Sequence, residues 1–508
     1  MAQRRAEPEA RNGPGLVTLY GEFTLINNRK VRCSVNLTEE HLVVQRLTSA
    51  PVGRNKVVLS LKDCVGCRAY PGDDKVNRCA YFAAYFYPLR RRWMCPGESR
   101  QRVEQCFRLS GLQDPRANLE EAEKWSRAVL ERSARQQAPR DGMLLRSWSH
   151  LDRTMMLLVN PQSGKGQALT FYYNHIQRML NEAGITHTLI ITEKQGHARE
   201  IVRDADLLQL DALVIMSGDG LLYEVINGLV ERPDWEEAIQ KPLGILPGGS
   251  GNALAASLHY YSGAPPVSSE ELLVSCGFLL CKGSVSHMDL VSIQLSSGPR
   301  LFSFLSLAWG FVADVDVESE KYRHMGAARF TIGTLVRLAS LRVYKGKLAY
   351  LPASREVGDL ENSTPSQRAM EAPHGPPDSL LPPLDQPLPG NWVVVPEEDF
   401  VLMLAMYQSH LAEDLLAAPE SRLDDGVIHL FYVTAGISRT ALLRLFLAME
   451  KGTHLASNCQ HLVHTKVRAL RLEPNTDFKG IITVDGEVVQ YGPVQAAVHR
   501  GLSRVISG

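Results

Sequence analysis

The sequence lacks a long hydrophobic run and has no excess of charge of either sign. Its longest apolar stretch, residues 301–313, contains two serines and a glycine and ends at Asp314, so it is unsuited to crossing a bilayer. Lys plus Arg and Asp plus Glu number 55 each, and this balance argues against a dedicated nucleic-acid-binding protein. The first residues lead into a charged segment rather than an apolar signal core, which favours a cytoplasmic location.

Cysteine is also sparse, with nine residues in a chain of 508. Cysteines spread so thinly, without a signal peptide, fit a reducing compartment. Cys64 and Cys67 have the spacing of half a metal or redox site, but no second pair stands at zinc-finger spacing. We therefore expect two reduced cysteines near the end of a strand.

The N-terminal part is predicted to be a β domain. Residues 1–14 are polar and predict a disordered tail. Residues 15–135 contain short strand-like runs and then a helical segment with Trp125 on its apolar face, which resembles a pleckstrin-homology-like domain; an unspecific small β domain is the alternative. Arg90–Trp93 lies on a predicted hairpin. This segment could contact anionic lipid headgroups, act as a nuclear localisation signal or be a solvated loop. Residues 136–151 predict a linker.

The remainder of the chain predicts two further domains, so that the fold class is α/β plus all-β. Strand-like and helical runs alternate over residues 152–286, which predicts an α/β nucleotide-binding domain with a parallel sheet. Ligands of such domains bind beyond the carboxyl ends of the strands. Residues 287–508 carry mostly strand-like runs and predict an antiparallel β-sandwich. Residues 352–390, rich in Pro, Ser and Glu, predict a surface loop or a disordered insertion.

The most informative segment is Ser217-Gly218-Asp219-Gly220, between an apolar run and a helical run. Two glycines let the backbone bend tightly and approach a ligand, and the start of the following helix favours an anion such as phosphate. Asp219 is then a fixed carboxylate beside a phosphate site, which suits a base that deprotonates an attacking hydroxyl. By itself, Gly-Asp-Gly is also a common turn.

Two further glycine-rich turns follow other predicted strands of the same sheet. Asn160–Gly166 is not a Walker loop, because no glycine stands five residues before Gly164 and a glycine replaces the Ser or Thr after the lysine. It is not a dinucleotide fingerprint either, since Leu169 occupies the place of the third glycine. Pro247–Asn252 again opens a helix. Each turn alone suits a plain loop, but three at successive strand ends predict one phosphate-binding edge.

These three turns resemble the diacylglycerol-kinase-type catalytic domain of lipid kinases. A narrower resemblance, to the sphingosine kinase family, is carried by residues 307–316, 318–323, 445–452 and 484–487. It runs from about Thr154 to the C-terminus, without the Pro-rich insertion. The N-terminal extension and that insertion resemble the type 2 form of the family, although the insertion is short for it.

The resemblance implies ATP-dependent phosphorylation of the primary hydroxyl of sphingosine and related sphingoid bases, giving sphingosine 1-phosphate. It implies that Asp219 is the catalytic base and that Mg²⁺ accompanies ATP, with unassigned protein ligands and Asp485 as one candidate. For Arg329 a solvated helix face is the alternative, and residues 485–487 also suit a bare hairpin turn. The nucleotide-binding residues that the match implies are Asn160, Pro161, Gln162, Thr192, Glu193, Lys194, Gln195, Gly196, Glu224, Gly249, Ser250, Gly251, Arg323, Arg329, Asp485, Gly486 and Glu487.

On the lipid side, Asp316 matches the family's carboxylate for the polar head of the lipid, assisted by Ser306. A carboxylate facing the cationic amine of sphingosine gives a physical reason to prefer it to diacylglycerol or ceramide, which carry no such charge. The acyl tail needs an apolar pocket, although each implied apolar residue also suits ordinary sandwich core. The substrate residues that the match implies are Ser217, Gly218, Asp219, Gly220, Ser306, Asp316, Phe311, Phe330, Leu411, Phe446 and His454.

Two other functions stay open on the sequence. One is a ceramide or diacylglycerol kinase, and the other is a catalytically silent lipid-binding scaffold. NAD kinases share the Gly-Asp-Gly feature, but residues 309–323 argue against them. An enzyme of a bilayer lipid is expected to dock peripherally on a membrane, with Arg90–Arg92 and Lys345–Lys347 as candidate contacts. A nuclear location and a homodimer stay open.

Overall fold

The structure is a computed structural model that describes residues 19–26, 31–47, 56–72, 79–91, 98–136, 153–325, 328–353 and 375–508, apart from the side chains of residues 323–331. The chain separates into two compact units, Met1–Leu151 with Met179–Gly184, and Asp152–Arg178 with Ile185–Gly508. The predicted tail and linker, and residues 354–374 of the predicted insertion, lie outside the described residues.

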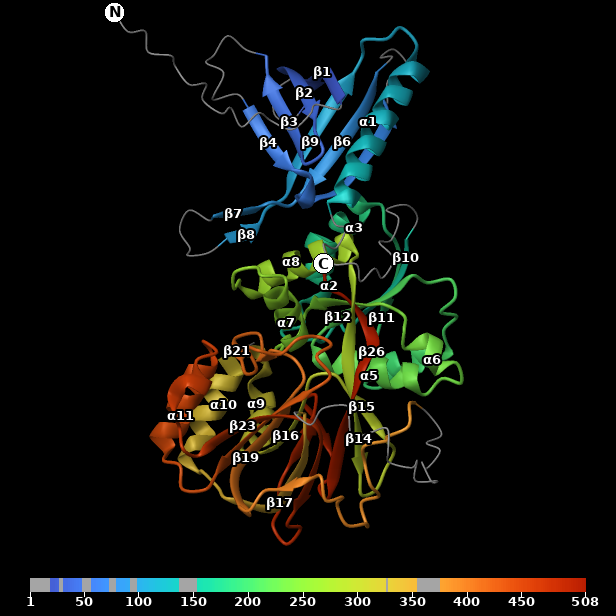
Figure 1. Cartoon of the computed structure of the whole chain (residues 1–508). Coiled ribbons are helices and arrows are strands. Elements are labelled where there is room, and N and C mark those ends of the chain that lie inside the picture. Colours follow the sequence, from blue (N-terminus) through green and yellow to red (C-terminus); the bar gives the residue numbers. More distant parts are fainter. Residues whose placement is uncertain are drawn as a thin grey trace, which may run out of the picture. The chain divides into compact units, whose positions relative to one another are not determined.

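The first unit is an antiparallel sheet with one long helix, α1 (Pro115–Arg135), packed against it (Figure 1). Asp114 caps this helix by accepting a hydrogen bond from the Arg116 amide, and Pro115 occupies its first position. Trp125 stacks on Phe82 in the core, with ring centroids 5.6 Å apart. The strands, in the order in which they pair, are β4 (Lys56–Ser60), β3 (His41–Arg46), β2 (Val31–Leu37), β1 (Leu19–Leu25), β9 (Val103–Leu109), β6 (Ala80–Phe86) and β5 (Cys64–Pro71).

Two features singled out in the sequence lie in this unit. Cys64 and Cys67 belong to β5, and both are buried free thiols. Burial raises the pKa of the Cys67 thiol. Arg90 and Arg91 lie in a short strand, β7 (Leu89–Arg91), which pairs with β8 (Glu98–Arg100). Arg92 and Trp93 fall outside the described residues.

The second unit is built around one large mixed sheet. Its two central parallel strands, Ala212–Ser217 and Leu243–Pro247, are short apolar runs that are buried on both faces. The strands of this unit are β10 (Thr154–Val159), β11 (Thr186–Ile191), β12 (Ala212–Ser217), β13 (Leu243–Pro247), β14 (Val285–Leu295), β15 (Leu301–Ser303), β16 (Ser306–Gly310), β17 (Tyr344–Pro352), β18 (Val393–Val394), β19 (Asp399–Met406), β20 (His410–Ala412), β21 (Leu415–Leu416), β22 (Ile428–Thr434), β23 (Leu462–Pro474), β24 (Ile482–Val484), β25 (Glu487–Val489) and β26 (Val494–Ile506).

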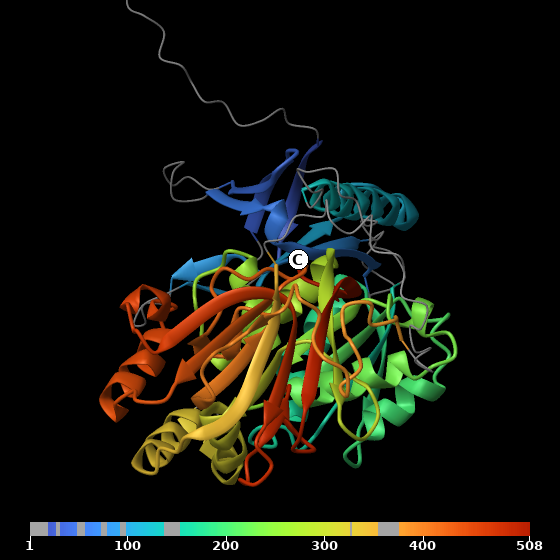
Figure 2. The ribbon, with the colours of Figure 1, turned by 60° about the horizontal axis from the view of Figure 1, so that its bottom comes forward.

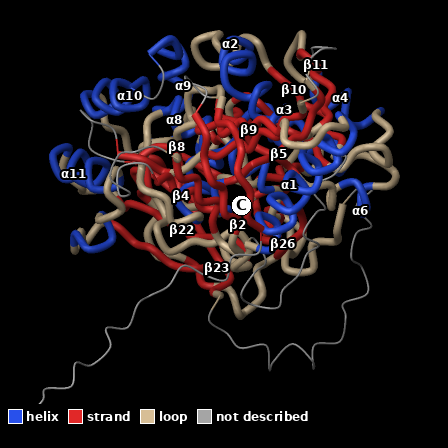
Figure 3. Tube along the Cα trace, turned by 90° about the horizontal axis from the view of Figure 1, so that it is seen from above, coloured by secondary structure: helices blue, strands red, loops and turns tan. Residues whose placement is uncertain are grey.

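Helix α5 packs against β12, and α7 and α8 pack against β13. Helices α9, α10 and α11 lie close to one another (Figure 3). The helices after residue 153 are α2 (Ala168–Phe171), α3 (Gln177–Ala183), α4 (His197–Asp204), α5 (Asp219–Val230), α6 (Trp235–Ala238), α7 (Ala253–Tyr261), α8 (Ser269–Lys282), α9 (Phe311–Ser319), α10 (Ala328–Ala339) and α11 (Arg439–Met449).

The C-terminal strand β26 joins the parallel and antiparallel strands into one sheet. It pairs in parallel with β13 and in antiparallel with β14 and β23, and Figure 2 shows it in red between the green and the orange parts of the ribbon. The predicted fold class is confirmed, with parallel α/β, antiparallel and N-terminal all-β parts. Because one sheet runs through residues 154–506, the predicted limits at 286 and 287 stay predictions.

The described part of the predicted insertion is a packed strap rather than a free loop. Asp378 accepts hydrogen bonds from Ser292 (2.6 Å) and Gln294 (2.5 Å) of β14 and pairs with Arg300. Leu380, Leu381 and Leu388 pack against a buried cluster that includes Trp392. Residues 375–390 therefore belong to the folded unit. In the part of the chain that the structure describes, no helix is both long and apolar enough to span a membrane.

Candidate active site

The order β11-β10-β12-β13 places the glycine-rich turns together. The chain leaves β10 toward β11 on one side and returns to β12 on the other, so the topological switch point lies between β10 and β12. Ligands of parallel sheets bind at this point, beyond the carboxyl ends of the strands. A cavity of about 720 Å³ opens there, between the three turns and residues from the antiparallel part of the sheet.

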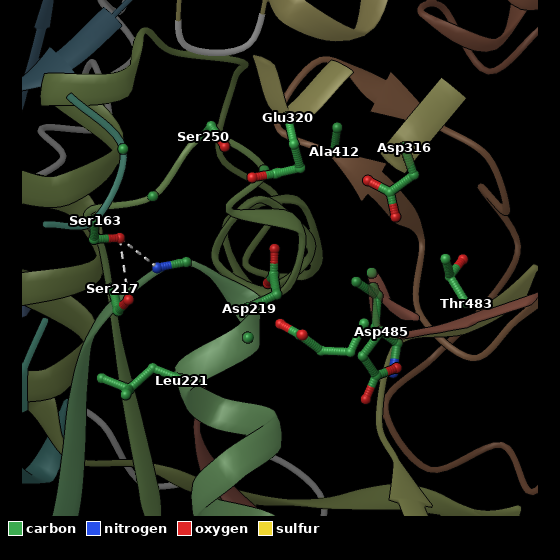
Figure 4. A pocket seen from close by; sticks show the side chains of 18 of the residues that line it. Ser163, Ser217, Asp219, Leu221, Ser250, Asp316, Glu320, Ala412, Thr483 and Asp485 are labelled. Atoms are coloured by element: carbon green, nitrogen blue, oxygen red, sulfur yellow. Dashed lines mark hydrogen bonds between the residues drawn. The ribbon is translucent and has the colours of Figure 1, made fainter. Parts of the chain in front are cut away.

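The three turns contact one another directly. The Ser163 hydroxyl oxygen accepts hydrogen bonds from the Ser217 hydroxyl (3.0 Å) and from the Gly218 amide (3.1 Å), as Figure 4 shows. Gly249, from the third turn, approaches Gly218 so closely that no side chain fits between them. The edge predicted from three separate motifs is therefore one packed surface.

Replacing Gly249 by alanine is expected to lower the free energy of unfolding by about 1–3 kcal/mol, the usual cost of overpacking. A Cβ atom at this position would lie 2.3 Å from the Gly218 Cα atom, so the backbone must shift. Gly248→Ala is the matched control, because its Cβ atom would meet its nearest neighbours at an ordinary 3.5 Å. Denaturant unfolding of both variants measures the difference; equal stability would contradict the close approach.

Asp219 is held by the first turn of another helix. Its carboxylate oxygens accept hydrogen bonds from the amides of Ala253 (2.9 Å) and Leu254 (3.2 Å), at the start of α7. Asp219 is itself the first residue of α5. The positive ends of two helix dipoles therefore meet at this carboxylate. Figure 4 shows its side chain pointing into the cavity, with Asp316 and Asp485 across the space from it.

The loop after β11 forms the second polar wall. Residues Thr192–Gln195 line the cavity, and the Glu224 carboxylate accepts hydrogen bonds from the amides of Gly196 (2.9 Å) and Ala198 (3.2 Å). Gly196 has φ +80, a left-handed conformation that glycine adopts without strain. Glu224 therefore positions this loop against α5 while it also lines the cavity.

The opposite wall includes the turn between β24 and β25. Asp485 and Gly486 have φ of +52 and +85, typical of a two-residue hairpin turn. The hairpin predicted as the alternative is present, and it also lines the cavity. A Cβ atom on Gly220 would lie 2.8 Å from Glu487 Oε1, and one on Gly486 would lie 3.3 Å from Asp316 Oδ2. The turn therefore lies between the Gly-Asp-Gly loop and Asp316.

Asp485 organises the segment that precedes β16. Its carboxylate accepts hydrogen bonds from the Ser303 hydroxyl (2.6 Å) and from the amides of Phe304, Leu305 and Ser306 at 2.9–3.0 Å. The chain is therefore divided into β15 and β16 around this carboxylate. Both oxygens of Asp485 accept hydrogen bonds within the protein, and its candidacy as a metal ligand stays a prediction.

The pKa of Asp485 predicts a specific pH dependence of stability. Burial raises this pKa from 3.8 to about 6, despite the hydrogen bonds that favour the charged form. A raised folded-state pKa contributes stability that is fully present below about pH 4 and is lost as the pH rises through 6. Asp485→Asn does not titrate, so its unfolding free energy relative to the wild type is expected to rise by roughly 3 kcal/mol between pH 4 and pH 7. Urea unfolding across this range measures the difference; a constant difference would contradict the raised pKa.

Part of the cavity wall is apolar. Leu411, Ala412 and Leu415 of the β20–β21 hairpin contribute to it, together with Val315 of α9 and Phe446 of α11. The cavity wall thus combines backbone-rich turns with apolar side chains.

Most of the predicted site residues come together here, although their individual roles stay predictions. The predicted residues in the cavity wall are Asn160, Gln162, Thr192, Glu193, Lys194, Gln195, Ser217, Gly218, Asp219, Gly220, Glu224, Gly249, Ser250, Gly251, Ser306, Asp316, Leu411, Phe446, Asp485, Gly486 and Glu487.

Four predicted residues with described side chains are not part of the cavity wall. Pro161 and Gly196 lie in the turns behind it. Phe311 packs against Phe446, with ring centroids 5.3 Å apart, and His454 is buried against Phe431 at 5.9 Å. The side chains of Arg323, Arg329 and Phe330 lie outside the described residues, so those predictions stay open.

Sequence reasoning missed other residues of the wall. Glu320 follows Asp316 by four positions, a helical spacing that would have placed both on one face. Ser163 and Gly164 belong to a turn already singled out. The apolar members carry no local signal. The residues missed are Ser163, Gly164, Leu221, Leu305, Ala308, Val312, Val315, Val317, Glu320, Thr334, Ala412, Leu415, Thr483 and Val488.

Among the described residues, no group of three His, Cys, Asp or Glu side chains is arranged to hold a metal ion. Mg²⁺ is commonly held by one or two carboxylates together with phosphate oxygens and water. Glu487, which reaches Gly220 of the Gly-Asp-Gly loop, is a carboxylate in a suitable place.

The chain is similar to a protein-family model and to several known proteins. Residues 154–293 match the family model described as the diacylglycerol kinase catalytic domain. Human sphingosine kinase 1 is 55% identical over 354 residues, covering 70% of this chain and 91% of that protein. Human sphingosine kinase 2 is 38% identical over an alignment of 619 residues, covering 100% of this chain and 94% of that protein. A crystal structure of a diacylglycerol kinase from Bacillus anthracis str. Sterne covers 70% of this chain and 96% of its own, with a TM-score of 0.43 and 16% identity.

Proposed function

The chain belongs to the sphingosine kinase family and is an ATP-dependent kinase of sphingosine-type lipids, and we propose that Asp219 is the base of its transfer reaction. The observation that carries this proposal is the position of Asp219. Its carboxylate is fixed by two backbone amides and lines a cavity whose wall has both polar turns and apolar side chains. Such a carboxylate can accept the proton of a lipid hydroxyl whose tail lies against the apolar side chains.

In the proposed reaction, the oxygen of the primary hydroxyl of sphingosine attacks the γ-phosphorus of ATP. The bond between this phosphorus and the β–γ bridging oxygen breaks, ADP leaves, and the hydroxyl proton passes to Asp219. The products are sphingosine 1-phosphate and ADP. Because little covalent chemistry falls to the protein, positioning and charge stabilisation account for most of the catalysis.

The glycine-rich turns are proposed to hold the nucleotide. Gly249–Gly251 and Asn160–Gly166 present backbone amides, which bind phosphate oxygens without a side chain in the way. The approach of these turns to Gly218 supports a compact phosphate site. Arg323 and Arg329 are proposed to neutralise charge on the transferring group. When bound with ATP, Mg²⁺ would neutralise phosphate charge, and Glu487 is the proposed protein ligand.

Asp316 is proposed to select the lipid. Its carboxylate lies beside Gly486 and lines the cavity together with Ser306. A charge-assisted hydrogen bond to the lipid ammonium is available to sphingosine but not to ceramide or diacylglycerol. Leu411, Leu415 and Phe446 then accommodate the tail, with roughly 0.8 kcal/mol gained for each methylene that is buried.

We also propose a location for the enzyme in the cell. Its lipid substrate resides in bilayers, so we expect a cytoplasmic enzyme that contacts a membrane surface peripherally. A nuclear pool and a homodimer are open alternatives. The predicted ranges 15–135, 152–286 and 287–508 are retained as proposed β, nucleotide-binding and lipid-binding domains.

A lipid panel tests the proposal. The purified full chain is incubated with γ-labelled ATP and sphingosine, ceramide or diacylglycerol, and labelled lipid is measured. We expect sphingosine to exceed the two neutral lipids by about 10²-fold, the value of one well-placed charged contact. Preference for ceramide or diacylglycerol would contradict the assigned selectivity. Transfer to none of the lipids would favour the lipid-binding scaffold instead.

A further inference from the structure

The hairpin β20–β21 forms a lipid-side wall of the cavity and has few hydrogen bonds between its own strands. It is a separate two-stranded sheet of three and two residues, and an isolated hairpin of this size is at best marginally stable. Its side chains Leu411, Ala412 and Leu415 line the cavity. The position of this wall therefore depends on the groups that hold the hairpin from behind.

Glu413, at the turn of this hairpin, contacts the third glycine-rich turn in two ways. Its backbone amide donates a hydrogen bond to the Gly251 carbonyl (2.7 Å). Its carboxylate accepts one hydrogen bond from the Asn252 side-chain amide (3.1 Å) and another from the Ser269 hydroxyl of α8 (2.7 Å). Glu413 is thus a direct link between the lipid-side wall and the nucleotide-side turn.

Asn252 carries this link into the turn itself. It has φ +53, an uncommon conformation for a residue with a side chain. Its side-chain oxygen accepts a hydrogen bond from the Gly249 amide (2.9 Å), and its side-chain nitrogen donates to the Gly249 carbonyl (3.1 Å). A single side chain therefore closes residues 249–252 into a fixed loop, and Glu413 holds that side chain.

The same loop leads directly to the catalytic carboxylate. Ala253 and Leu254, which follow Asn252, are the residues whose amides donate to Asp219. A second contact between hairpin and helix runs in parallel, because the His410 amide donates to the Ser257 hydroxyl of α7 (3.1 Å). The hairpin thus holds the start of α7, and the start of α7 holds Asp219.

We propose that Glu413 is a positioning residue that couples occupancy of the lipid pocket to the conformation of the nucleotide loop. This inference rests on the proposed function. A tail against Leu411 and Leu415 orders the hairpin, and through Glu413 and Asn252 it orders the loop that receives ATP. The second ligand then meets a loop that is already ordered, so each ligand strengthens binding of the other by the same factor.

Glu413→Ala and Glu413→Gln separate coupling from general stability. Alanine removes the acceptor for Asn252, whereas glutamine keeps an oxygen for Asn252 and offers its NH₂ group to the Ser269 hydroxyl oxygen. Ser269→Ala is the matched control, because it removes only the contact to α8 and leaves the link between Glu413 and Asn252 in place. The backbone bond to Gly251 remains in all three variants.

The experiment measures the dissociation constant of a non-hydrolysable ATP analogue for the full chain, with and without saturating sphingosine. For the wild type, we expect sphingosine to lower this constant at least about fivefold, the lower end of typical coupling. Glu413→Ala is expected to reduce the effect to less than about twofold, while Glu413→Gln and Ser269→Ala retain it. Thermal unfolding of each variant checks that the variant is folded at the temperature of the binding measurement.

Two outcomes overturn the coupling role. One is a wild type in which sphingosine leaves nucleotide affinity unchanged, and the other is full coupling in Glu413→Ala. Neither outcome contradicts the proposed function, which the lipid panel tests separately by transfer of labelled phosphate. Failure of the wild type to bind the analogue or to phosphorylate sphingosine would instead contradict the proposed function itself.

Discussion

Asp219→Asn is expected to lower kcat for sphingosine phosphorylation by about 10³-fold, within the usual contribution of a general base. Asparagine has the same size and can still accept one hydrogen bond from the start of α7, but it cannot take up the proton of the hydroxyl. The dissociation constant for ATP should change little, because the turns that are proposed to hold the phosphates stay intact. Steady-state turnover and nucleotide titration measure the two quantities.

Asp204→Asn is the matched control for this substitution. Asp204 is an exposed residue at the end of α4, away from the cavity wall. It should retain wild-type turnover. An Asp219→Asn enzyme with more than about one tenth of wild-type kcat would contradict a base at this position, since even a modest general base contributes more.

Asp316→Asn is expected to lower kcat/KM for sphingosine by about 10²-fold, the usual effect of removing one partner of a desolvated charged pair. The residual turnover of ceramide and diacylglycerol should be unchanged, because neither carries the ammonium group that Asp316 is proposed to bind. The ratio of kcat/KM values for sphingosine and diacylglycerol is the quantity to measure.

Glu318→Gln is the control on the same helix. Glu318 pairs with Arg337 (3.0 Å) and does not line the cavity, so its loss should leave lipid selectivity unchanged. A loss in Asp316→Asn that is equal for charged and neutral lipids would show that the carboxylate supports the fold of the site rather than the choice of lipid.

The parallel half of the sheet could be predicted from the sequence because its central strands, β12 and β13, are buried on both faces. Such strands are short apolar runs, as in Ala212–Ser217, and glycine-rich turns mark their carboxyl ends. Parallel strands bring those turns to one edge, so three separate motifs predicted one site. Site residues that lie together within one turn could therefore be predicted from the sequence.

Structure that depends on partners far away in the sequence could not be predicted from local patterns. β26 (Val494–Ile506) joins the two halves of the sheet, yet it contains Arg500, Gly501 and Arg504 and has no regular alternation. Its strand conformation is set by pairing with β13, β14 and β23. Helices α9 and α11 were missed for a related reason, because their apolar residues face a cavity or a neighbour across the fold.

The hydrogen bonds of Asp485 could not be predicted for the same reason. Its turn was identified as part of the site, but the carboxylate was a candidate metal ligand. The donors that engage it lie 179–182 residues away in the chain. No local pattern shows such a contact. Glu413 is a second example, since its link to Asn252 spans 161 residues.

The most direct test of the central claim, that Asp219 accepts the proton of the attacking hydroxyl, compares two lipid acceptors. One is sphingosine, and the other is an analogue whose primary hydroxyl is made more acidic by nearby fluorine. A more acidic hydroxyl needs less help from a base, so the ratio of wild-type to Asp219→Asn transfer rates should be at least about tenfold smaller for the analogue. The same ratio for both acceptors would contradict proton transfer to Asp219.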